Sequence, residues 1–332
     1  MDHRSLAGCM FGLLTITSAV AAEPAQQKAT DNQQQQEKDG DQAWLDDFRS
    51  GLNNSVDATA RWLDDFFGDK RSFDDSQGST GRLSVAPQWD QYDGFEVDTS
   101  LRAKVRLPQA EQRFSAFFGS DGEDDLRGPS SARRSVVRSS RDDDWLLGFG
   151  FDPYLHDGNP VSFSVGVRGG IHLDPYTRAR YRFDLPFNDN HQLRARSDAF
   201  WRDSDGFGVE QYIDIEQQFS SLWLGRWSLH GKFAERTKGL EWYNGYTIFY
   251  LYDEQRAISS EFWLYGQTDN EAETLNDYGF RVNHRQQLWR EWFYIETWAG
   301  LHWPRYEFED HRSAKWMLGI EFELHFGADY YD

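Results

Sequence analysis

The stretch from Lys315 to Phe326 alternates between apolar and mainly polar side chains. One parity holds Trp316, Leu318, Ile320, Phe322, Leu324 and Phe326, and the other holds Lys315, Met317, Gly319, Glu321, Glu323 and His325. Successive side chains of a strand point to opposite faces, so this pattern predicts a strand with one apolar face. A soluble strand usually has about five or six residues, whereas a tilted membrane-spanning strand needs roughly ten. The stretch is therefore long enough to cross a membrane as a strand.

The same alternation continues through residues 81–327 and divides into about fourteen strand-length segments, with roughly twelve to sixteen as the range. The predicted strands are 82–91, 95–107, 111–120, 143–151, 160–172, 175–185, 190–202, 207–219, 221–234, 239–251, 254–267, 274–287, 290–303 and 313–326. A soluble sandwich would also alternate, but a second sheet would have to cover its apolar face. Strands this long in a row favour lipid as the cover. The pattern predicts an all-β fold, a transmembrane antiparallel up-and-down β-barrel.

Composition agrees with a barrel and excludes other classes. The chain of 332 residues is only 39% hydrophobic yet has 16% aromatic residues, which suits apolar side chains at alternate positions. Beyond the N-terminus there is no run of about 18 apolar residues, so a helical membrane protein is excluded. The formal net charge of -20 argues against a nucleic-acid partner, which would require a basic surface.

The N-terminus reads as an export signal. Residues 1–22 carry a polar start, an apolar centre and an A-x-A cleavage site at Ala19 to Ala21. Cys9 also ends a short lipoprotein-like motif, but no apolar core precedes it. Removal of this segment would leave a chain without cysteine, so neither a thiolate metal site nor any other cofactor is expected. Residues 23–42 are rich in Gln, Asp and Lys and predict a disordered linker.

Residues 43–69 contain an internal repeat. Trp44-Leu45-Asp46-Asp47-Phe48 recurs as Trp62-Leu63-Asp64-Asp65-Phe66, at an offset of 18 residues. This offset corresponds to five helical turns, so Trp44, Phe48, Trp62 and Phe66 are predicted to recur on one side of an amphipathic helix. Two arrangements remain open: a periplasmic helix that docks on the barrel rim, on its own copy or on a periplasmic partner, and a plug whose aspartates meet basic residues inside the barrel. Residues 70–80 form a second predicted linker, and residues 328–332 a C-terminal tail.

With these features, the chain resembles the outer-membrane β-barrel proteins of Gram-negative bacteria. The resemblance rests on the signal peptide, the alternating strands and the ending from Gly319 to Phe326. That ending is similar to the C-terminal signal read by the barrel assembly machinery, although Met317 and the residues after Phe326 depart from it. The resemblance implies an outer-membrane location, periplasmic turns and extracellular loops, and contact with outer-membrane lipid and lipopolysaccharide.

A sector of arginines is the most distinctive candidate for function. Arginine facing lipid at the bilayer midplane costs about 2–4 kcal/mol, so these side chains are predicted to face inward. The predicted sector comprises Arg168, Arg178, Arg180, Arg182, Arg194, Arg196 and Arg202, with Glu210, Asp214 and Glu216 on the following strand. The acids and bases could pair and fill a narrow lumen. Alternatively, the arginines could form a track for anionic solutes, since a guanidinium donates two parallel hydrogen bonds to carboxylate or phosphate.

Two weaker patterns in the sequence involve histidine. His311 and Ser313 match the spacing of a catalytic pair in outer-membrane lipid esterases, but strand parity would turn both inward, away from lipid. His230, His302 and His325 share the inward parity on different strands, which predicts solvated histidines rather than a metal site. The favoured hypothesis is a monomeric, non-enzymatic channel for small polar or anionic solutes. A non-conducting adaptor barrel with a periplasmic partner and a lipid esterase are the alternatives.

Overall fold

The computed structural model divides the chain into two compact units, residues 1–46 and residues 47–332. Everything described below belongs to the second unit. The described residues are 79–91, 93–107, 113–119, 145–153, 160–169, 173–236, 239–253, 255–268, 275–290, 292–305 and 311–327, with Thr59, Leu63, Phe66 and Phe67. The predicted signal peptide, the first linker, Trp44, Phe48, Trp62 and the C-terminal tail lie outside these residues.

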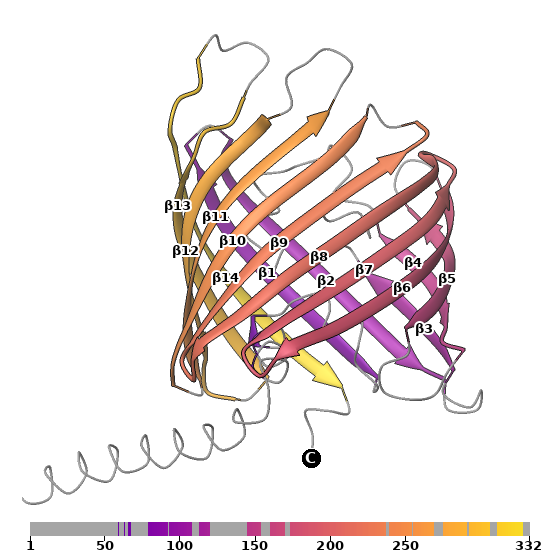
Figure 1. Cartoon of the computed structure of the whole chain (residues 1–332), viewed down its shortest axis with the longest axis horizontal. Helices are drawn as coiled ribbons and strands as arrows, with labels where there is room; N and C mark the ends of the chain where they lie inside the picture. The colour runs from indigo at the N-terminus through magenta and orange to yellow at the C-terminus, as the bar shows by residue number, and fades with distance from the viewer. Residues whose placement is uncertain are drawn as a thin grey trace, which may run out of the picture. The chain divides into compact units, whose positions relative to one another are not determined.

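Fourteen antiparallel strands close into one barrel (Figure 1). Each strand pairs with its neighbours in sequence, and β1 pairs with β14 to complete the ring. The strands are β1 (Thr80–Asp90), β2 (Gly94–Arg106), β3 (Phe114–Gly119), β4 (Leu146–Phe151), β5 (Val161–Arg168), β6 (Asp174–Asn188), β7 (His191–Arg202), β8 (Gly206–Ser220), β9 (Trp223–Ala234), β10 (Leu240–Asp253), β11 (Arg256–Thr268), β12 (Leu275–Gln287), β13 (Phe293–His302) and β14 (Lys315–Gly327). The predicted barrel and its strand number are confirmed.

Strand boundaries follow the alternation closely, and the largest difference is at β5. The pattern predicted a strand that continues to residue 172, whereas β5 ends at Arg168. Gly169 and Gly170 follow at once, and glycine weakens a strand because it has no side chain to pack and a high conformational entropy.

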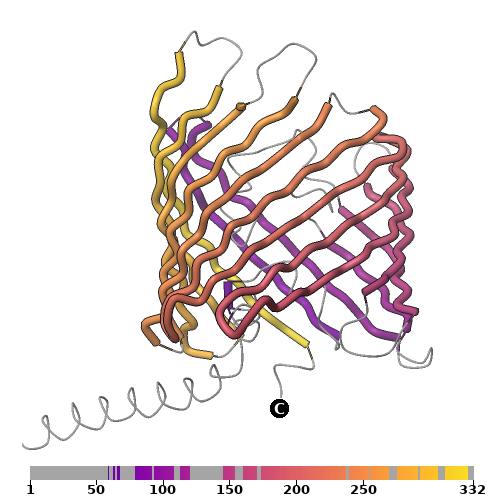
Figure 2. Tube along the Cα trace, viewed as in Figure 1, coloured from indigo at the N-terminus to yellow at the C-terminus, as the bar shows by residue number. Residues whose placement is uncertain are grey.

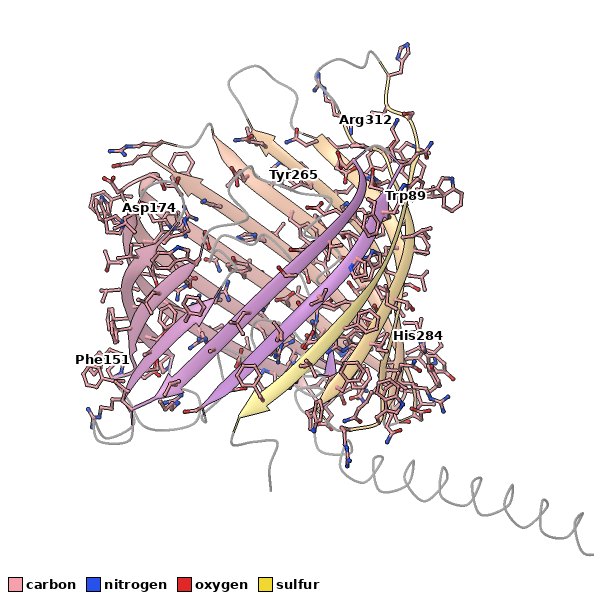
Figure 3. The ribbon with its side chains drawn as sticks, turned by 180° about the vertical axis from the view of Figure 1, so that it is seen from behind. Trp89, Phe151, Asp174, Tyr265, His284 and Arg312 are labelled. Carbon is pink, nitrogen blue, oxygen red and sulfur yellow. The ribbon has the colours of Figure 1, made fainter. Side chains whose placement is uncertain are left out.

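The barrel is apolar outside and polar inside. Large apolar side chains such as Phe95 (71% exposed) and Trp316 (55% exposed) point outward from their strands. The inward positions between them hold buried charged groups, including Glu216 and Arg281, which are both 0% exposed. The labelled Trp89 projects from the outer wall in Figure 3. This distribution reverses that of a soluble protein, since here the interior is the polar part.

Aromatic rings on the inner wall lie against glycines of the adjacent strand. Trp298 is directly opposite Gly319 in the register of β13 and β14, and Trp263 is opposite Gly279 in β11 and β12. A Cβ on Gly319 would lie 2.0 Å from Cζ2 of Trp298. The missing side chain therefore lets the ring lie flat over the neighbouring backbone, as in other cross-strand aromatic–glycine pairs. This explains why a glycine occupies a position of polar parity in β14.

The two ends of the barrel differ. Thr80 and Gly327 are paired, so the first and last strands begin and finish at the same end, called here the terminal end. Two-residue turns at 189–190 and 221–222 connect strands there, whereas residues 203–205 connect β7 to β8 at the opposite, far end (Figure 2). Within the described residues, no helix is long and apolar enough to cross a membrane.

Candidate functional site: charge clusters on the inner wall

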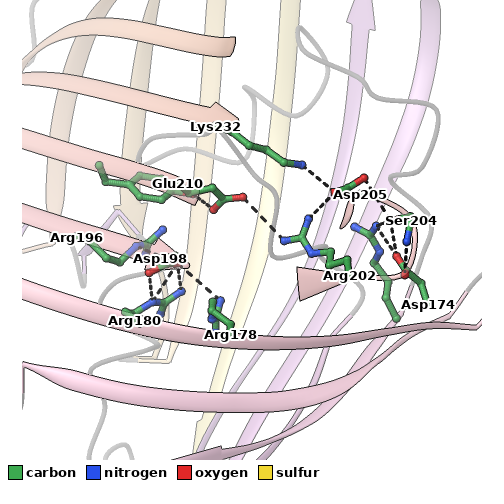
Figure 4. Close-up of polar contacts among 12 residues, drawn as sticks. Asp174, Arg178, Arg180, Arg196, Asp198, Arg202, Ser204, Asp205, Glu210 and Lys232 are labelled. Carbon is green, nitrogen blue, oxygen red and sulfur yellow. Dashed lines mark hydrogen bonds and ion pairs between the residues drawn. The ribbon is translucent and has the colours of Figure 1, made fainter. Parts of the chain in front are cut away.

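Three arginines surround one carboxylate on the inner face of β6 and β7. Asp198 is 2% exposed and lies opposite Arg180 in the strand register. Nε and Nη2 of Arg180 donate to the two carboxylate oxygens, each at 2.9 Å. Arg196 and Arg178 approach the same carboxylate at 3.6 Å and 4.0 Å (Figure 4). The group of Asp198 with these three arginines is called the Asp198 cluster.

The Asp198 cluster continues sideways into an aromatic stack. The guanidinium of Arg196 lies 3.7 Å from the centre of the Tyr212 ring, a cation–π contact. The Tyr212 ring in turn stacks on His230 with a centroid distance of 3.8 Å, and its hydroxyl donates to Glu210 at 3.2 Å. These contacts connect β7, β8 and β9 and hold the guanidinium of Arg196 in a defined position.

A second cluster lies nearer the far end. Asp205, in the connection between β7 and β8, accepts from Arg202 at 3.0 Å and from Lys232 at 3.3 Å. Arg168 donates to Asp174 at 3.0 Å, and the Asp174 carboxylate also accepts from the Ser204 hydroxyl at 2.7 Å (Figure 4). Because charged groups anchor it on both sides, the short β7–β8 connection is tied to the inner wall.

A third cluster lies nearer the terminal end. Glu216 on β8 accepts from Arg226 at 2.6 Å and from Arg194, so a carboxylate again lies between two guanidinium groups. Asp214, on the same face of β8, accepts from the Ser228 hydroxyl at 2.5 Å. Burial of Glu216 is possible because it is ion-paired with Arg194 and Arg226, and Asp214 is stabilised by its hydrogen bond.

The opposite side of the barrel carries its own buried ion pairs. Arg281 donates to Glu261 at 3.0 Å. Arg285 lies between Glu296, at 3.3 Å, and Glu323, at 3.1 Å. The inward face of the last strand is thus ion-paired to β12.

The ten predicted lumen residues are all buried or half-buried. Arg178, Arg180 and Arg196 meet at one carboxylate, Arg194 meets Glu216, and Arg202 lies 3.9 Å from Glu210. Their roles in lining a pore remain predictions. Sequence reasoning missed the acids that pair with Arg168, Arg180 and Arg202, namely Asp174, Asp198 and Asp205, and it missed the ion pairs of Arg281 and Arg285 on the opposite side. Asp198 could have been found by placing the β6 and β7 segments in hairpin register, because this sets it against Arg180.

The histidines and the proposed catalytic pair lie outside the three charge clusters described above. His302 lies between Asp90 at 2.8 Å and Asp277 at 3.3 Å, and it links β13 to β1 and β12. Within the part of the chain that the structure describes, no group of three or more His, Cys, Asp or Glu is arranged to hold a metal ion. His311 and Ser313 are exposed in the segment that precedes β14, and the inward orientation expected from strand parity stays a prediction.

A separate apolar cluster lies at the terminal end. Leu63, Phe66 and Phe67 are buried against four strands of the inner wall. The wall residues of this cluster are Leu224, Phe249, Leu251, Ala257 and Tyr294. Phe66 is the one residue of the predicted plug set that falls within the described residues, and its ring centre lies 5.8 Å from that of Tyr294.

No protein-family model and no curated protein matches this sequence. Three of the similar solved structures are the KdgM porin in complex with disordered oligogalacturonate, the CymD monoaromatic hydrocarbon channel, and the outer membrane protein opdK from Pseudomonas aeruginosa. Their sequence identities are 8%, 6% and 8%, and their TM-scores are 0.35, 0.42 and 0.39. The matches cover 73%, 76% and 75% of this chain and 98%, 89% and 99% of those chains.

The fold assignment rests on the strand pairing of this chain itself. All fourteen strands pair in a closed ring, their outer faces are apolar and exposed, and their inner faces are polar and buried. Only closed barrels and helices satisfy every backbone group within lipid, and strands of this inside-out character satisfy them as a barrel. The architecture is that of an outer-membrane β-barrel, a closed ring of antiparallel strands that is apolar outside and polar inside.

Proposed function

We propose that the protein is an outer-membrane channel for small polar solutes, with a preference for anions, and that its terminal end faces the periplasm. The observation that carries this proposal is the Asp198 cluster, in which three guanidinium groups face one carboxylate. Arginine stays charged at every physiological pH and presents a planar fork that suits carboxylate or phosphate. A solute with such a group would therefore meet donors held in place by Tyr212 and Asp198.

The other clusters support the proposal by ordering the inner wall. Paired charges on neighbouring strands hold one another in fixed positions, and the side chains of Arg178 and Arg196 remain 12% and 13% exposed. A wall of this kind allows ions to enter without binding them too tightly to leave, which conduction requires.

Planar-bilayer recording of the purified full-length protein tests the proposal. Discrete conductance steps and a reversal potential on the anion-selective side are expected under a KCl gradient. Folding is checked independently by the heat-dependent shift in electrophoretic mobility. A folded protein that shows no conductance, both as the parent and with Phe66 and Phe67 replaced by Ala, refutes the channel.

Dense pairing of the inner wall favours one alternative, a non-conducting barrel that acts as an adaptor for a periplasmic partner. Six charged side chains, Arg281, Arg285, Glu216, Glu261, Glu296 and Glu321, are each less than 2% exposed. Such packing is what a filled interior would show. In that case polar solutes would not cross liposomes that contain the protein, and pull-down with residues 23–80 intact would recover a partner that is lost without them.

A further inference from the structure

The inner wall changes character at the terminal end of β9, β10 and β11. Inward positions in the middle of these strands are polar, such as His230, Thr247 and Glu261. Nearer the terminal end, the inward positions become apolar, with Leu224 and Leu251 both at 0% exposure. Together with Phe249, Ala257 and Tyr294, these residues form an apolar patch, called here the seat. Contact between this apolar patch and water is unfavourable, so the patch is expected to be covered by another apolar segment.

The seat is covered by a short helical segment of the same chain. Thr59, Leu63 and Phe66 are helical, and the backbone N–H of Phe67 donates to the carbonyl of Leu63 at 2.8 Å. Leu63 and Phe67 are one turn apart, so they point the same way. Their exposures are 1% and 2%, and that of Phe66 is 4%.

The contacts between the segment and the seat are aromatic and specific in position. The Phe67 ring centre lies 5.2 Å from that of Phe249 on β10, and the Phe66 ring meets Tyr294 on β13 edge-on. Tyr294 is itself held from behind by the guanidinium of Arg285 at 4.6 Å. The segment is therefore joined to both sides of the seat, and the ion pairs of the wall fix one of its anchor points.

The seat distinguishes between the two copies of the internal repeat. Both copies supply the leucine and the first phenylalanine, as Leu45 and Phe48 or as Leu63 and Phe66. The next position is Phe67 in the second copy but Arg49 in the first. Phe67 meets Phe249, and the guanidinium of Arg226 lies 5.2 Å from the centre of the same Phe249 ring. An arginine at that place would lose the ring contact and bring two like charges together in a buried site.

We propose that the seat is an internal binding site for an amphipathic helix of the pattern Leu-x-x-Phe-Phe, and that its occupant is the Leu63–Phe67 segment of this chain. The bound segment closes the terminal end of the barrel by apolar contact. The first copy of the repeat is excluded by Arg49. The closing effect rests on the proposed channel function, whereas the binding itself does not.

The test uses the full-length protein with Cys9 replaced by Ala and a single reporter, Thr59→Cys. Thr59 is 1% exposed, so a water-soluble maleimide is expected to label this cysteine slowly in the parent. Phe67→Arg is expected to speed labelling on the order of a hundredfold, because it breaks the buried contact and opens the segment locally. Phe48→Arg in the first copy is the matched control and is expected to leave labelling unchanged.

Salt separates apolar binding from an electrostatic plug. At roughly 1 M KCl the Debye length is about 3 Å, which screens exposed ion pairs but leaves apolar contacts intact. Slow labelling is expected to persist there. Fast labelling of the parent, release by salt, or an equal effect of Phe48→Arg and Phe67→Arg each overturns the proposal.

Conductance gives a separate readout. If Phe67→Arg speeds labelling and also raises conductance, both proposals stand. If it speeds labelling while neither protein conducts, the seat stands and the channel fails. A second variant, Phe66→Ala with Phe67→Ala, repeats the comparison without adding charge, and it guards against failure of the arginine variant to fold.

Discussion

Replacement of Asp198 by Asn is the sharpest perturbation of the inner wall, because one carboxylate offsets three guanidinium groups. Arg180, Arg196 and Arg178 lie at 2.9, 3.6 and 4.0 Å from it. Asparagine keeps the shape and one acceptor oxygen for Arg180, but it removes the negative charge. The variant therefore makes the cluster one unit more positive with little change in packing.

The size of the effect follows from distance and solvent. The electrostatic interaction energy between one unit charge and a solute ion about 4 Å away in water is about 1 kcal/mol. That energy corresponds to about a fivefold change in local ion concentration, since about 1.4 kcal/mol is tenfold. Removal of a buried ionic partner costs about 3–5 kcal/mol of folding stability, and the retained amide oxygen makes this an upper limit.

The assay is the reversal potential of the reconstituted protein under a KCl gradient. Asp198→Asn is expected to raise the anion-to-cation permeability ratio by about threefold to fivefold, because the more positive wall concentrates chloride. Asp198→Glu, which keeps the charge, is the matched control and is expected to retain the parental ratio. Arg180→Gln is expected to shift the ratio in the opposite direction.

A correctly folded Asp198→Asn variant with the parental reversal potential would refute the reasoning. It would mean that ions crossing the barrel do not pass the cluster. An equal shift in Asp198→Glu would assign the effect to altered packing instead of charge.

Three further predictions concern stability. Gly319→Ala places a Cβ against the Trp298 ring and is expected to cost about 1–3 kcal/mol in urea unfolding from micelles, whereas Gly231→Ala, whose nearest heavy atom would be 3.5 Å away, is expected to be neutral. Equal midpoints for the two would contradict the ring-over-glycine account. Val85→Arg, on the outward face, is expected to lower the free energy of unfolding in lipid by about 2–4 kcal/mol, whereas the control Val85→Leu is expected to change it little. An arginine variant as stable as the parent would mean that this face is not against lipid. Glu216→Ala leaves two buried arginines without their carboxylate and is expected to cost about 3–5 kcal/mol, and a change under about 1 kcal/mol would show that water already screens them.

Sequence alone determined the barrel because alternation is a local property. The side-chain period of a strand is two residues, so each segment reveals its own two faces without knowledge of its neighbours. From Trp316 to Phe326 the apolar parity never breaks, and length separates this strand from a soluble one. The number of strands and the inward direction of the arginine sector follow from the same rule.

The partners of the buried charges were decided by the tertiary structure. Parity shows that Arg180 faces inward, but the register of β6 against β7 places Asp198 opposite it, and the closed ring brings His302 to Asp90 across the β13–β14 and β1–β14 pairs. Register and closure depend on hydrogen bonds between strands, which are not encoded in one segment's pattern.

The seat also separates what the sequence determined from what the tertiary structure decided. The repeat and its amphipathic character are visible in the sequence, and an ionic contact of its aspartates was one expectation for a plug. The aspartates lie outside the described residues, so that expectation stays a prediction, and the contacts that are described are apolar, from Leu63, Phe66 and Phe67 to the inner wall. Leu224 lies opposite Phe249 and Leu251 lies opposite Ala257, so the pairing of β9, β10 and β11 makes their terminal ends one surface. Sequence thus determined the faces of each element, and three-dimensional closure decided which faces meet, because contact between distant segments is set by the ring and not by local pattern.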